Sequence, residues 1–98
     1  MKIIISNIKN KKNINDSLEL ARNLKEWFTQ EAIESMKVDF QVNNILIALE
    51  KNKIAGFLCY SSYNGSIKIL WIGVKRDYQR KGIVSLLKNK LEKIAKKY

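Results

Sequence analysis

Two tight-turn signals join three strand patterns in the middle of the chain, and this feature limits the fold more than any other. Residues 45–50 and 54–60 are two strand-like runs, and Lys51-Asn52-Lys53 between them reads as a tight hairpin turn. Asn64-Gly65 then tolerates positive φ at both central positions of a hairpin turn. Residues 67–74 follow with apolar side chains on both faces, which predicts a buried strand. Strands connected by such short turns must pair antiparallel.

Helical patterns flank this central segment. Residues 2–6 read as an opening strand and residues 7–15 as a polar connection. Asp16 with Glu19 has capping-box spacing, so a helix is expected to begin there, and its apolar face would run to Trp27 and Phe28, which we expect in the core. Thr29 predicts the N-cap of a second helix. Apolar residues at helical spacing indicate a last helix that reaches the end of the sequence: Ile83, Leu86, Leu87, Leu91, Ile94, Ala95 and Tyr98.

Composition excludes several kinds of chemistry. The 98 residues suit a single domain, residues 1–98, without a recognisable linker. With no His and one Cys, a single chain cannot assemble a Cys/His zinc site, a His-based triad or a disulfide framework, and we expect no metal site. The N-terminal apolar run is too short for a signal peptide and no stretch approaches a membrane span, so we expect a cytoplasmic protein without a membrane partner, with Cys59 buried.

The net charge of +10 is unevenly distributed. Residues 1–12 contribute +4, residues 13–74 contribute −1 and residues 75–98 contribute +7. Charge of this kind suits either a phosphate-bearing ligand or nucleic acid, and it also suits a solvated helix face. Nucleic acid is the weakest of these interpretations, because no recognised binding motif or stacking platform accompanies the charge.

The strand 67–74, the basic turn after it and the last helix form the most informative unit. A strand that enters a helix through a Gly-containing turn presents free backbone N–H groups and a partial positive charge, which together favour an anion. Arg80 and Lys81 add donors, and Gly82 leaves room for close approach. Gly73 inside the strand indicates a bulge or a close backbone approach. The spacing fits neither a Walker loop nor the dinucleotide fingerprint.

The run from Leu70 to Ile83, LWIGVKRDYQRKGI, resembles the acetyl-CoA binding motif of the GNAT superfamily of N-acetyltransferases, whose signature is Gln/Arg-x-x-Gly-x-Gly/Ala. The element order β-α-α-β-β-β-α is also similar to the N-terminal part of that fold. The resemblance implies an α+β, three-layer α/β/α-like architecture with a mostly antiparallel sheet. It also implies acetyl-CoA as acetyl donor and an unidentified amine as acceptor. The last signature position, Gly or Ala in the family, is Val84 here.

The same resemblance assigns roles to ten residues. Backbone groups of the strand would contact the pantetheine arm, a backbone N–H there would polarise the thioester carbonyl, and amides at the helix start would hold the pyrophosphate. The residues so assigned are Ile72, Gly73, Val74, Gln79, Arg80, Lys81, Gly82, Ile83, Val84 and Ser85.

No catalytic residue can be assigned. The strand 67–74 contains no acid, and Glu31, Glu34, Asp39 and Glu50 are expected at the surface. Tyr60, Tyr63 and Tyr78 are interpreted as packing or turn residues.

The family's fold continues beyond the elements predicted here. Without the family's C-terminal strands and helix, strand 67–74 would be an apolar edge, and a homodimer is the expected cover. Two functions follow: an acetyl-CoA-dependent N-acetyltransferase or the cofactor-binding part of one, and alternatively a non-catalytic module for dimerisation or partner binding.

Overall fold

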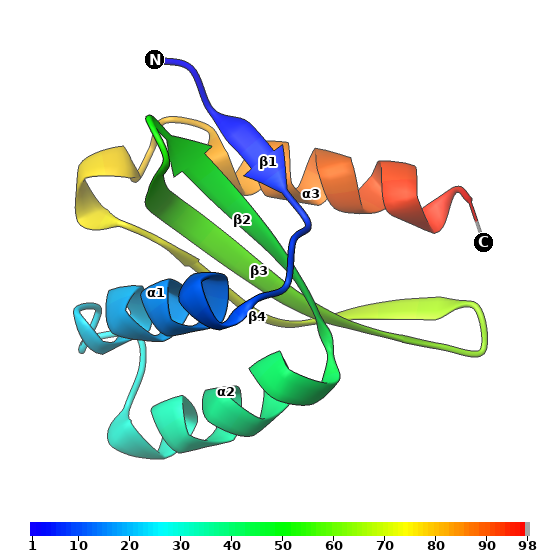
Figure 1. Ribbon diagram of the computed structural model, residues 1–98, viewed down its shortest axis with the longest axis horizontal. Coiled ribbons are helices and arrows are strands. Elements are labelled where there is room, and N and C mark those ends of the chain that lie inside the picture. Colours follow the sequence, from blue (N-terminus) through cyan, green and yellow to red (C-terminus); the bar gives the residue numbers. More distant parts are fainter. Residues whose placement is uncertain (98) are drawn as a thin grey trace.

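The computed structural model describes residues 1–97, and the predicted helical position of Tyr98 lies outside them. Its elements follow the predicted order (Figure 1). The strands are β1 (Ile4–Ser6), β2 (Asn44–Glu50), β3 (Lys53–Tyr63) and β4 (Ser66–Val74), and the helices are α1 (Lys11–Arg22), α2 (Gln30–Val42), a 3-10 turn η1 (Arg76–Tyr78) and α3 (Ile83–Ala95).

The sheet has the strand order β1-β2-β3-β4 with every pair antiparallel. Both predicted hairpin turns have positive φ at their central positions, at Lys51 (51°) and Asn52 (65°), and at Asn64 (51°) and Gly65 (78°). This is the backbone that matches the twist of the flanking strands. The mostly antiparallel sheet predicted from the sequence is therefore confirmed.

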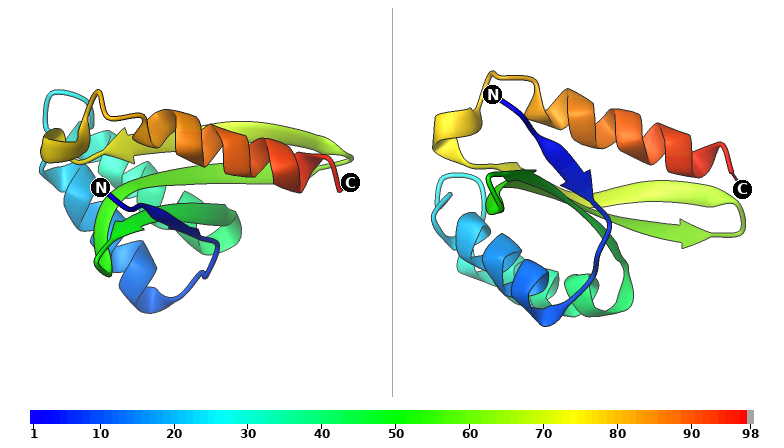
Figure 2. Two further views of the ribbon diagram at one scale, coloured as in Figure 1. Left: turned by 90° about the horizontal axis from the view of Figure 1, so that it is seen from above. Right: turned by 45° about the horizontal axis from the view of Figure 1, so that its top comes forward.

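Two hydrophobic clusters, one on each face of the sheet, produce three layers (Figure 2). Helices α1 and α2 cover one face, where the Phe40 and Phe57 rings pack in a T-shaped arrangement with centroids 5.5 Å apart. Helix α3 covers the other face and buries Ile83, Leu87 and Leu91. The predicted α+β, three-layer fold is confirmed. Within residues 1–97, no helix combines the length and apolarity needed to cross a bilayer.

The prediction for the first helix is wrong at both ends. Helix α1 begins at Lys11 because Asn10 caps it by accepting a bond of 2.8 Å from the Asn13 amide. Asp16 lies inside the helix and pairs with Lys12. The helix ends at Arg22, so Trp27 lies beyond it and is 68% exposed rather than in the core.

The second helix agrees with the sequence interpretation, and the last strand departs from it. Thr29 caps α2 as predicted, accepting from the Ala32 amide at 3.1 Å. Strand β4 is not buried as predicted, because it forms an edge of the sheet and only Gly73 and Val74 are buried along it. Apolar residues on both of its faces therefore reflect helices above and below the edge, not complete burial.

The aromatic contact under α2 should dominate the stability of a domain this small. Truncating the fully buried Phe40 to Ala should lower the free energy of unfolding by about 3–5 kcal/mol, because the lost contacts leave a cavity. Chemical denaturation followed by circular dichroism measures this. Val38→Ala is the matched control on the same helix, since Val38 is 62% exposed, and it should change stability by less than about 0.5 kcal/mol. Equal effects of the two substitutions would contradict the described packing.

Candidate functional site

The outer edge of β4 carries backbone groups that its pairing with β3 leaves available. Residues in an antiparallel pair alternate between exchanging both backbone bonds and exchanging neither. Lys75 donates to the Ala55 carbonyl at 2.8 Å, which makes Gly56 and Val74 a pair of the second kind. The N–H and C=O groups of Val74, and by the same alternation those of Ile72, therefore point away from β3.

Gln79 occupies one of these outward groups. Its side-chain amide Nε2 donates to the Val74 carbonyl oxygen at 3.1 Å. This bond joins the turn after β4 to the strand edge, and it accounts structurally for a Gln at the first position of the sequence signature. The outward N–H and C=O of Ile72 have no partner among the bonds that the structure describes.

Gly73 is required by the packing on the α1/α2 face. A Cβ at this position would lie 2.6 Å from Cε2 of Phe57, closer than such contacts allow. The prediction of a bulge or a close backbone approach at Gly73 is therefore only partly correct. The approach is that of an aromatic side chain, and the bulge falls at Leu70, because Trp71 pairs with Cys59 while Ile69 pairs with Tyr60.

The turn after η1 presents a helix N-terminus to open space. Gly82 caps α3 with φ of 83°, without a side-chain bond to the helix, and no atom lies within 4 Å of where a Cβ would stand. Leu86 makes the first helical bond, from its N–H to the Gly82 carbonyl at 3.1 Å. The amides of Ile83, Val84 and Ser85 precede that bond and are thus free of helical partners. Such a terminus, with its partial positive charge, suits an anion.

Two adjoining hollows connect the strand edge to this turn. One of about 340 Å³ lies along the end of β4, and one of about 250 Å³ lies at the start of α3. Val74, Gln79 and Val84 line both, so the two form one groove. Val84 is 40% exposed, with its side chain on the groove. The predicted residues that line the groove are Ile72, Gly73, Val74, Gln79, Arg80, Gly82, Ile83, Val84 and Ser85.

Lys81 does not line the groove. Its ammonium lies 5.9 Å from the centre of the Tyr78 ring, in cation–π range. The Tyr78 hydroxyl in turn donates to the carboxylate of Glu50 at the end of β2. That hydrogen bond to the carboxylate, with some desolvation, raises the pKa of Tyr78 above its ordinary value. Sequence reasoning assigned Tyr78 to a turn correctly, but nothing in the sequence pairs it with a residue 28 positions away.

The opposite wall of the groove was missed by the sequence interpretation. Leu24, Trp27 and Phe28, from the connection between α1 and α2, line the larger hollow across from β4. Phe28 also packs against Trp71, with ring centroids 6.3 Å apart. Assigning Trp27 and Phe28 to a helical core face hid this role, and only the true end of α1 at Arg22 would have revealed it.

An ion pair connects the two walls. The Arg76 guanidinium lies 2.6 Å from the Glu26 carboxylate and 3.4 Å from the Asn23 carbonyl oxygen. The bond from Arg76 lowers the pKa of Glu26 below its ordinary value of 4.5. Both side chains are largely exposed, so the pair contributes little to overall stability, and its consequence is local. It ties the α1–α2 connection to the start of η1.

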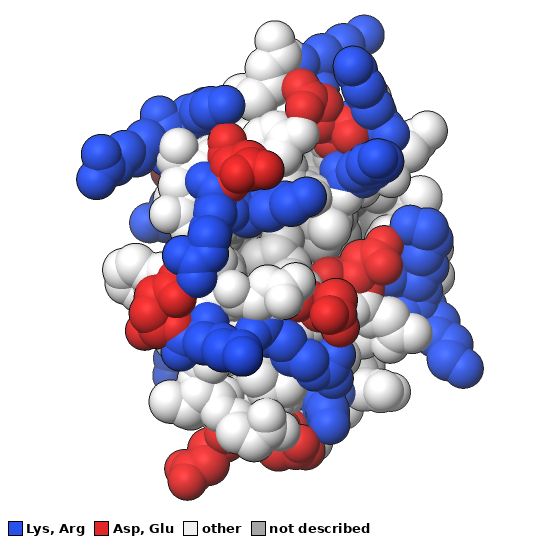
Figure 3. All heavy atoms as spheres, turned by 90° about the vertical axis from the view of Figure 1, so that its left-hand side faces the viewer, with Lys and Arg blue, Asp and Glu red and all other residues white. Residues whose placement is uncertain are grey.

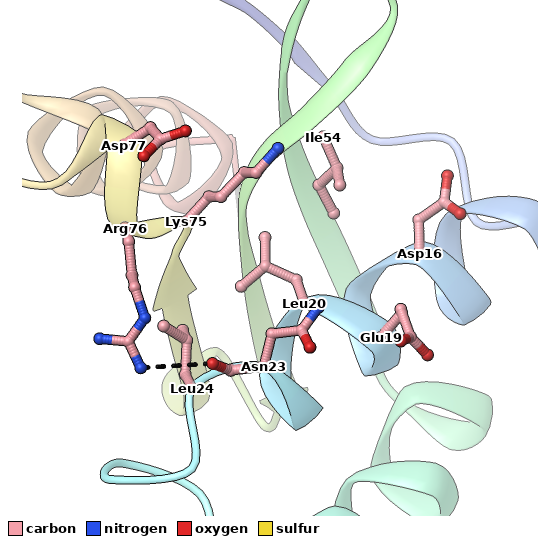
Figure 4. A pocket seen from close by; sticks show the side chains of 9 residues that line it. All are labelled: Asp16, Glu19, Leu20, Asn23, Leu24, Ile54, Lys75, Arg76 and Asp77. Carbon is pink, nitrogen blue, oxygen red and sulfur yellow. Dashed lines mark hydrogen bonds between the residues drawn. The ribbon is translucent and has the colours of Figure 1, made fainter.

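A larger hollow of about 400 Å³ lies between α1 and the start of η1, floored by Leu20, Leu24 and Ile54 (Figure 4). None of the predicted site residues lines it. Its charged side chains are mostly committed: Asp16 pairs with Lys12, Glu19 with Arg22 and Arg76 with Glu26. Lys75 extends across its mouth toward Ile54 in Figure 4. Of its two cationic side chains, Arg76 is therefore paired and Lys75 lies outside these ion pairs.

The surface charge is mixed rather than continuous. On the face that contains the 75–82 connection and the end of α1, acidic and basic side chains alternate (Figure 3). A sequence-independent nucleic-acid site gains affinity from each phosphate that a Lys or Arg neutralises, which favours a clustered basic surface. The mixed pattern on this face favours a small anion at a defined point instead.

Acidic side chains are absent from the groove lining within residues 1–97. Asp39 on α2 contacts β4, because its carboxylate accepts from the Trp71 indole at 2.7 Å. Asp39 and Glu50 are half-buried and bonded to Trp71 and Tyr78, so the prediction that both lie at the surface is wrong. In the same described part of the chain, no three His, Cys, Asp or Glu side chains gather as metal ligands would. The groove therefore offers backbone and side-chain donors, but none of its described lining residues is a carboxylate that could act as a general base.

Comparison with known proteins identifies the family and the fold. The model of the acetyltransferase (GNAT) family matches residues 16–98. A GNAT-family protein from Desulfovibrio desulfuricans has a TM-score of 0.85 at 15% identity, over 97% of this chain and 67% of that protein. Among curated proteins, none matches the chain. The chain belongs to the GNAT family of acetyltransferases.

Two further solved structures contain coenzyme A. The PaiA N-acetyltransferase of Thermoplasma acidophilum has a TM-score of 0.79 at 23% identity, over 99% of this chain and 74% of that protein. An aminoglycoside 6′-N-acetyltransferase has a TM-score of 0.77 at 19% identity, over 96% of this chain and 56% of that protein. At these identities the likeness concerns the fold, and the chain spans only part of each solved protein.

Cys59 should be chemically silent in the native protein. Its thiol is fully buried, and burial followed by the nearby Asp39 raises its pKa from 9.0 to about 12. Since only the thiolate reacts, a raised pKa keeps the thiol protonated at every pH below about 12. At pH 8 a maleimide should label native protein far more slowly than urea-unfolded protein, as read by mass spectrometry. Ser62→Cys, at an exposed position of the β3–β4 hairpin, is the reactive control. Equal native and unfolded rates for Cys59 would contradict this burial.

Proposed function

We propose that the chain is an acetyl-CoA-dependent N-acetyltransferase, or the cofactor-binding part of one, and that the groove along β4 and α3 holds acetyl-CoA. The observation that carries the proposal is that the outer edge of β4 and the N-terminus of α3 line one continuous groove. Outward backbone groups of β4 lead directly to the free amides at the start of α3. The pantetheine arm of coenzyme A carries amides and is joined to a diphosphate. It therefore suits a site where backbone groups of a strand edge are followed by free N–H donors at a helix start.

The residues present fit this cofactor. The amides of Ile83, Val84 and Ser85, with the open space at Gly82, would hold the diphosphate. Arg80 lines the same hollow and adds a charged donor, while Lys81 is held beside it over Tyr78. The relatives solved with coenzyme A lend support from outside the chain.

Bound there, acetyl-CoA would supply an acetyl group already activated as a thioester, so that transfer to an amine forms an amide and releases a thiol. The chain itself would position the thioester and polarise its carbonyl group. We assign the outward Ile72 N–H to the arm or to the thioester carbonyl, where a preorganised donor stabilises developing negative charge. Gln79 would keep the Val74 carbonyl from competing for the same partners. The acceptor belongs to the class of amines, and Cys59 as a free thiol fits a cytoplasmic setting.

A carboxylate introduced at the start of α3 tests the proposal. Gly82→Asp should weaken acetyl-CoA binding by at least about tenfold, because a like charge would stand where the diphosphate is held. Isothermal titration calorimetry measures the dissociation constant.

Gly65→Asp is the matched control. Gly65 also has positive φ and open space at its Cβ position, but it lies at the tip of the β3–β4 hairpin. Asp adopts positive φ more readily than most residues, and the two positions impose similar backbone strain, so both variants should fold and only Gly82→Asp should lose the cofactor. Wild-type protein that fails to bind acetyl-CoA at millimolar concentration would contradict the proposal and favour a non-catalytic module that acts by dimerisation or partner binding.

We also propose that residues 1–98 form one domain and that two copies associate through the hairpin end of β4 around Ile69, which leaves the outward groups of Ile72 and Val74 to the cofactor. The outer side of β4 pairs with no described strand, and Ile69 on it is 37% exposed. An open strand edge with apolar side chains invites another strand, and a two-fold axis allows the same edge to pair with itself.

Size-exclusion chromatography with light scattering tests the dimer. At micromolar concentration the chain should elute at twice the monomer mass. Ile69→Lys should restore the monomer mass by adding a charge to the edge, whereas Val38→Lys on the exposed side of α2 should leave the dimer intact. A monomeric wild type would contradict the pairing.

A further inference from the structure

An exposed tryptophan stands on the rim of the groove. Trp27 is 68% exposed, whereas the other tryptophan, Trp71, is half-buried and donates its indole N–H to Asp39. A large aromatic side chain left open to water gives up much of the burial free energy it could provide. Its exposure is therefore informative when it coincides with a candidate site.

Trp27 faces the part of the groove that the strand edge forms. The hollow it lines is also lined by Ile72, Gly73 and Val74, and it is predominantly apolar, with Gln79 the one polar side chain in its lining. The hollow at the start of α3, where the diphosphate would lie, does not include Trp27 among its lining residues. The indole thus stands beside the backbone edge of β4 and away from the anion end.

The position of Trp27 is fixed by its neighbours. Its own amide donates to the Leu24 carbonyl at 2.9 Å, and the Phe28 amide donates to the same oxygen at 3.0 Å. The preceding residue, Glu26, is held by Arg76 from the other wall. The turn that carries the indole is therefore bonded on both sides, which reduces the ordering that a ligand would have to impose.

On the basis of the function proposed above, we propose that Trp27 is a cofactor-binding residue that covers the pantetheine arm of coenzyme A against the edge of β4. The indole provides an apolar surface over the arm while the outward groups of Ile72 bond to its amides. The nucleotide half, bound at the start of α3, makes no contact with Trp27. This assignment gives the α1–α2 connection a role in ligand binding that the sequence pattern did not suggest.

Two ligands allow the contributions of the two halves of the cofactor to be measured separately. Coenzyme A carries the arm, and adenosine 3′,5′-bisphosphate represents the nucleotide half without it. Measured by calorimetry, Trp27→Ala should weaken the binding of coenzyme A by about five- to twentyfold, as expected for losing an aromatic contact surface. The same substitution should change the affinity for the bisphosphate by less than about twofold. Trp27→Phe should recover most of the loss because it keeps a ring.

Two controls accompany these variants. Tyr63→Ala removes an aromatic side chain of similar exposure, 77%, from the β3–β4 hairpin and should leave both affinities unchanged. Tryptophan fluorescence gives an independent readout: coenzyme A should change the emission of wild-type protein, and Trp27→Phe should lose that change although Trp71 remains. Circular dichroism should show all variants folded, since these side chains are exposed.

The outcomes are distinguishable. If wild-type protein binds coenzyme A and folded Trp27→Ala binds it equally well, the Trp27 assignment is wrong and the proposed function stands. If Trp27→Ala weakened the binding of both ligands equally, the assignment would also be wrong, because the contact would then not be with the arm. If wild-type protein binds neither ligand, the proposed function fails, and the Trp27 assignment fails with it.

Discussion

The pairing of β4 with β3 decides which backbone groups the rest of the molecule can use. The bond from Lys75 to Ala55 sets the alternation, so that Gly73 faces its partner strand and Ile72 and Val74 face outward. A shift of one residue would exchange these sets and would also drive the side chains to the opposite faces. The Phe57 ring against Gly73 resists such a shift, because a residue with a Cβ does not fit beneath it.

The groove depends on this edge because its other parts are fastened to it. Gln79 bonds to the Val74 carbonyl, which orients the turn ahead of α3, and the Tyr78 hydroxyl anchors that turn to Glu50. Arg76 extends the connection to the α1–α2 segment through Glu26. Each contact is individually modest, since exposed polar pairs contribute little. Together they hold the start of α3, the edge of β4 and the α1–α2 connection in fixed positions relative to one another.

The sequence predicted what short-range chemistry controls. Asn64-Gly65 determines a hairpin turn, Thr29 caps a helix, and the Gln79 to Gly82 run marks the helix start, so these features and the element order are confirmed. The first helix was misplaced because Asn10 and Asp16 are both acceptable caps, and only the tertiary packing selects between them. Trp27 was misassigned because apolar residues continue at helical spacing beyond Arg22, where α1 ends. The bonds from Tyr78 to Glu50 and from Arg76 to Glu26 join residues too distant in sequence for any pattern to pair.

We propose that a single groove, from the outer edge of β4 to the start of α3, receives the cofactor. Titrating ¹⁵N-labelled protein with coenzyme A and following amide chemical shifts tests it most directly, because outward and helix-start amides are the proposed contacts. The largest changes should fall at Ile72, at Val74 and from Arg80 to Ser85. Changes confined to the larger hollow around Lys75 and Ile54, or spread evenly over the Lys-rich face of α3, would contradict it.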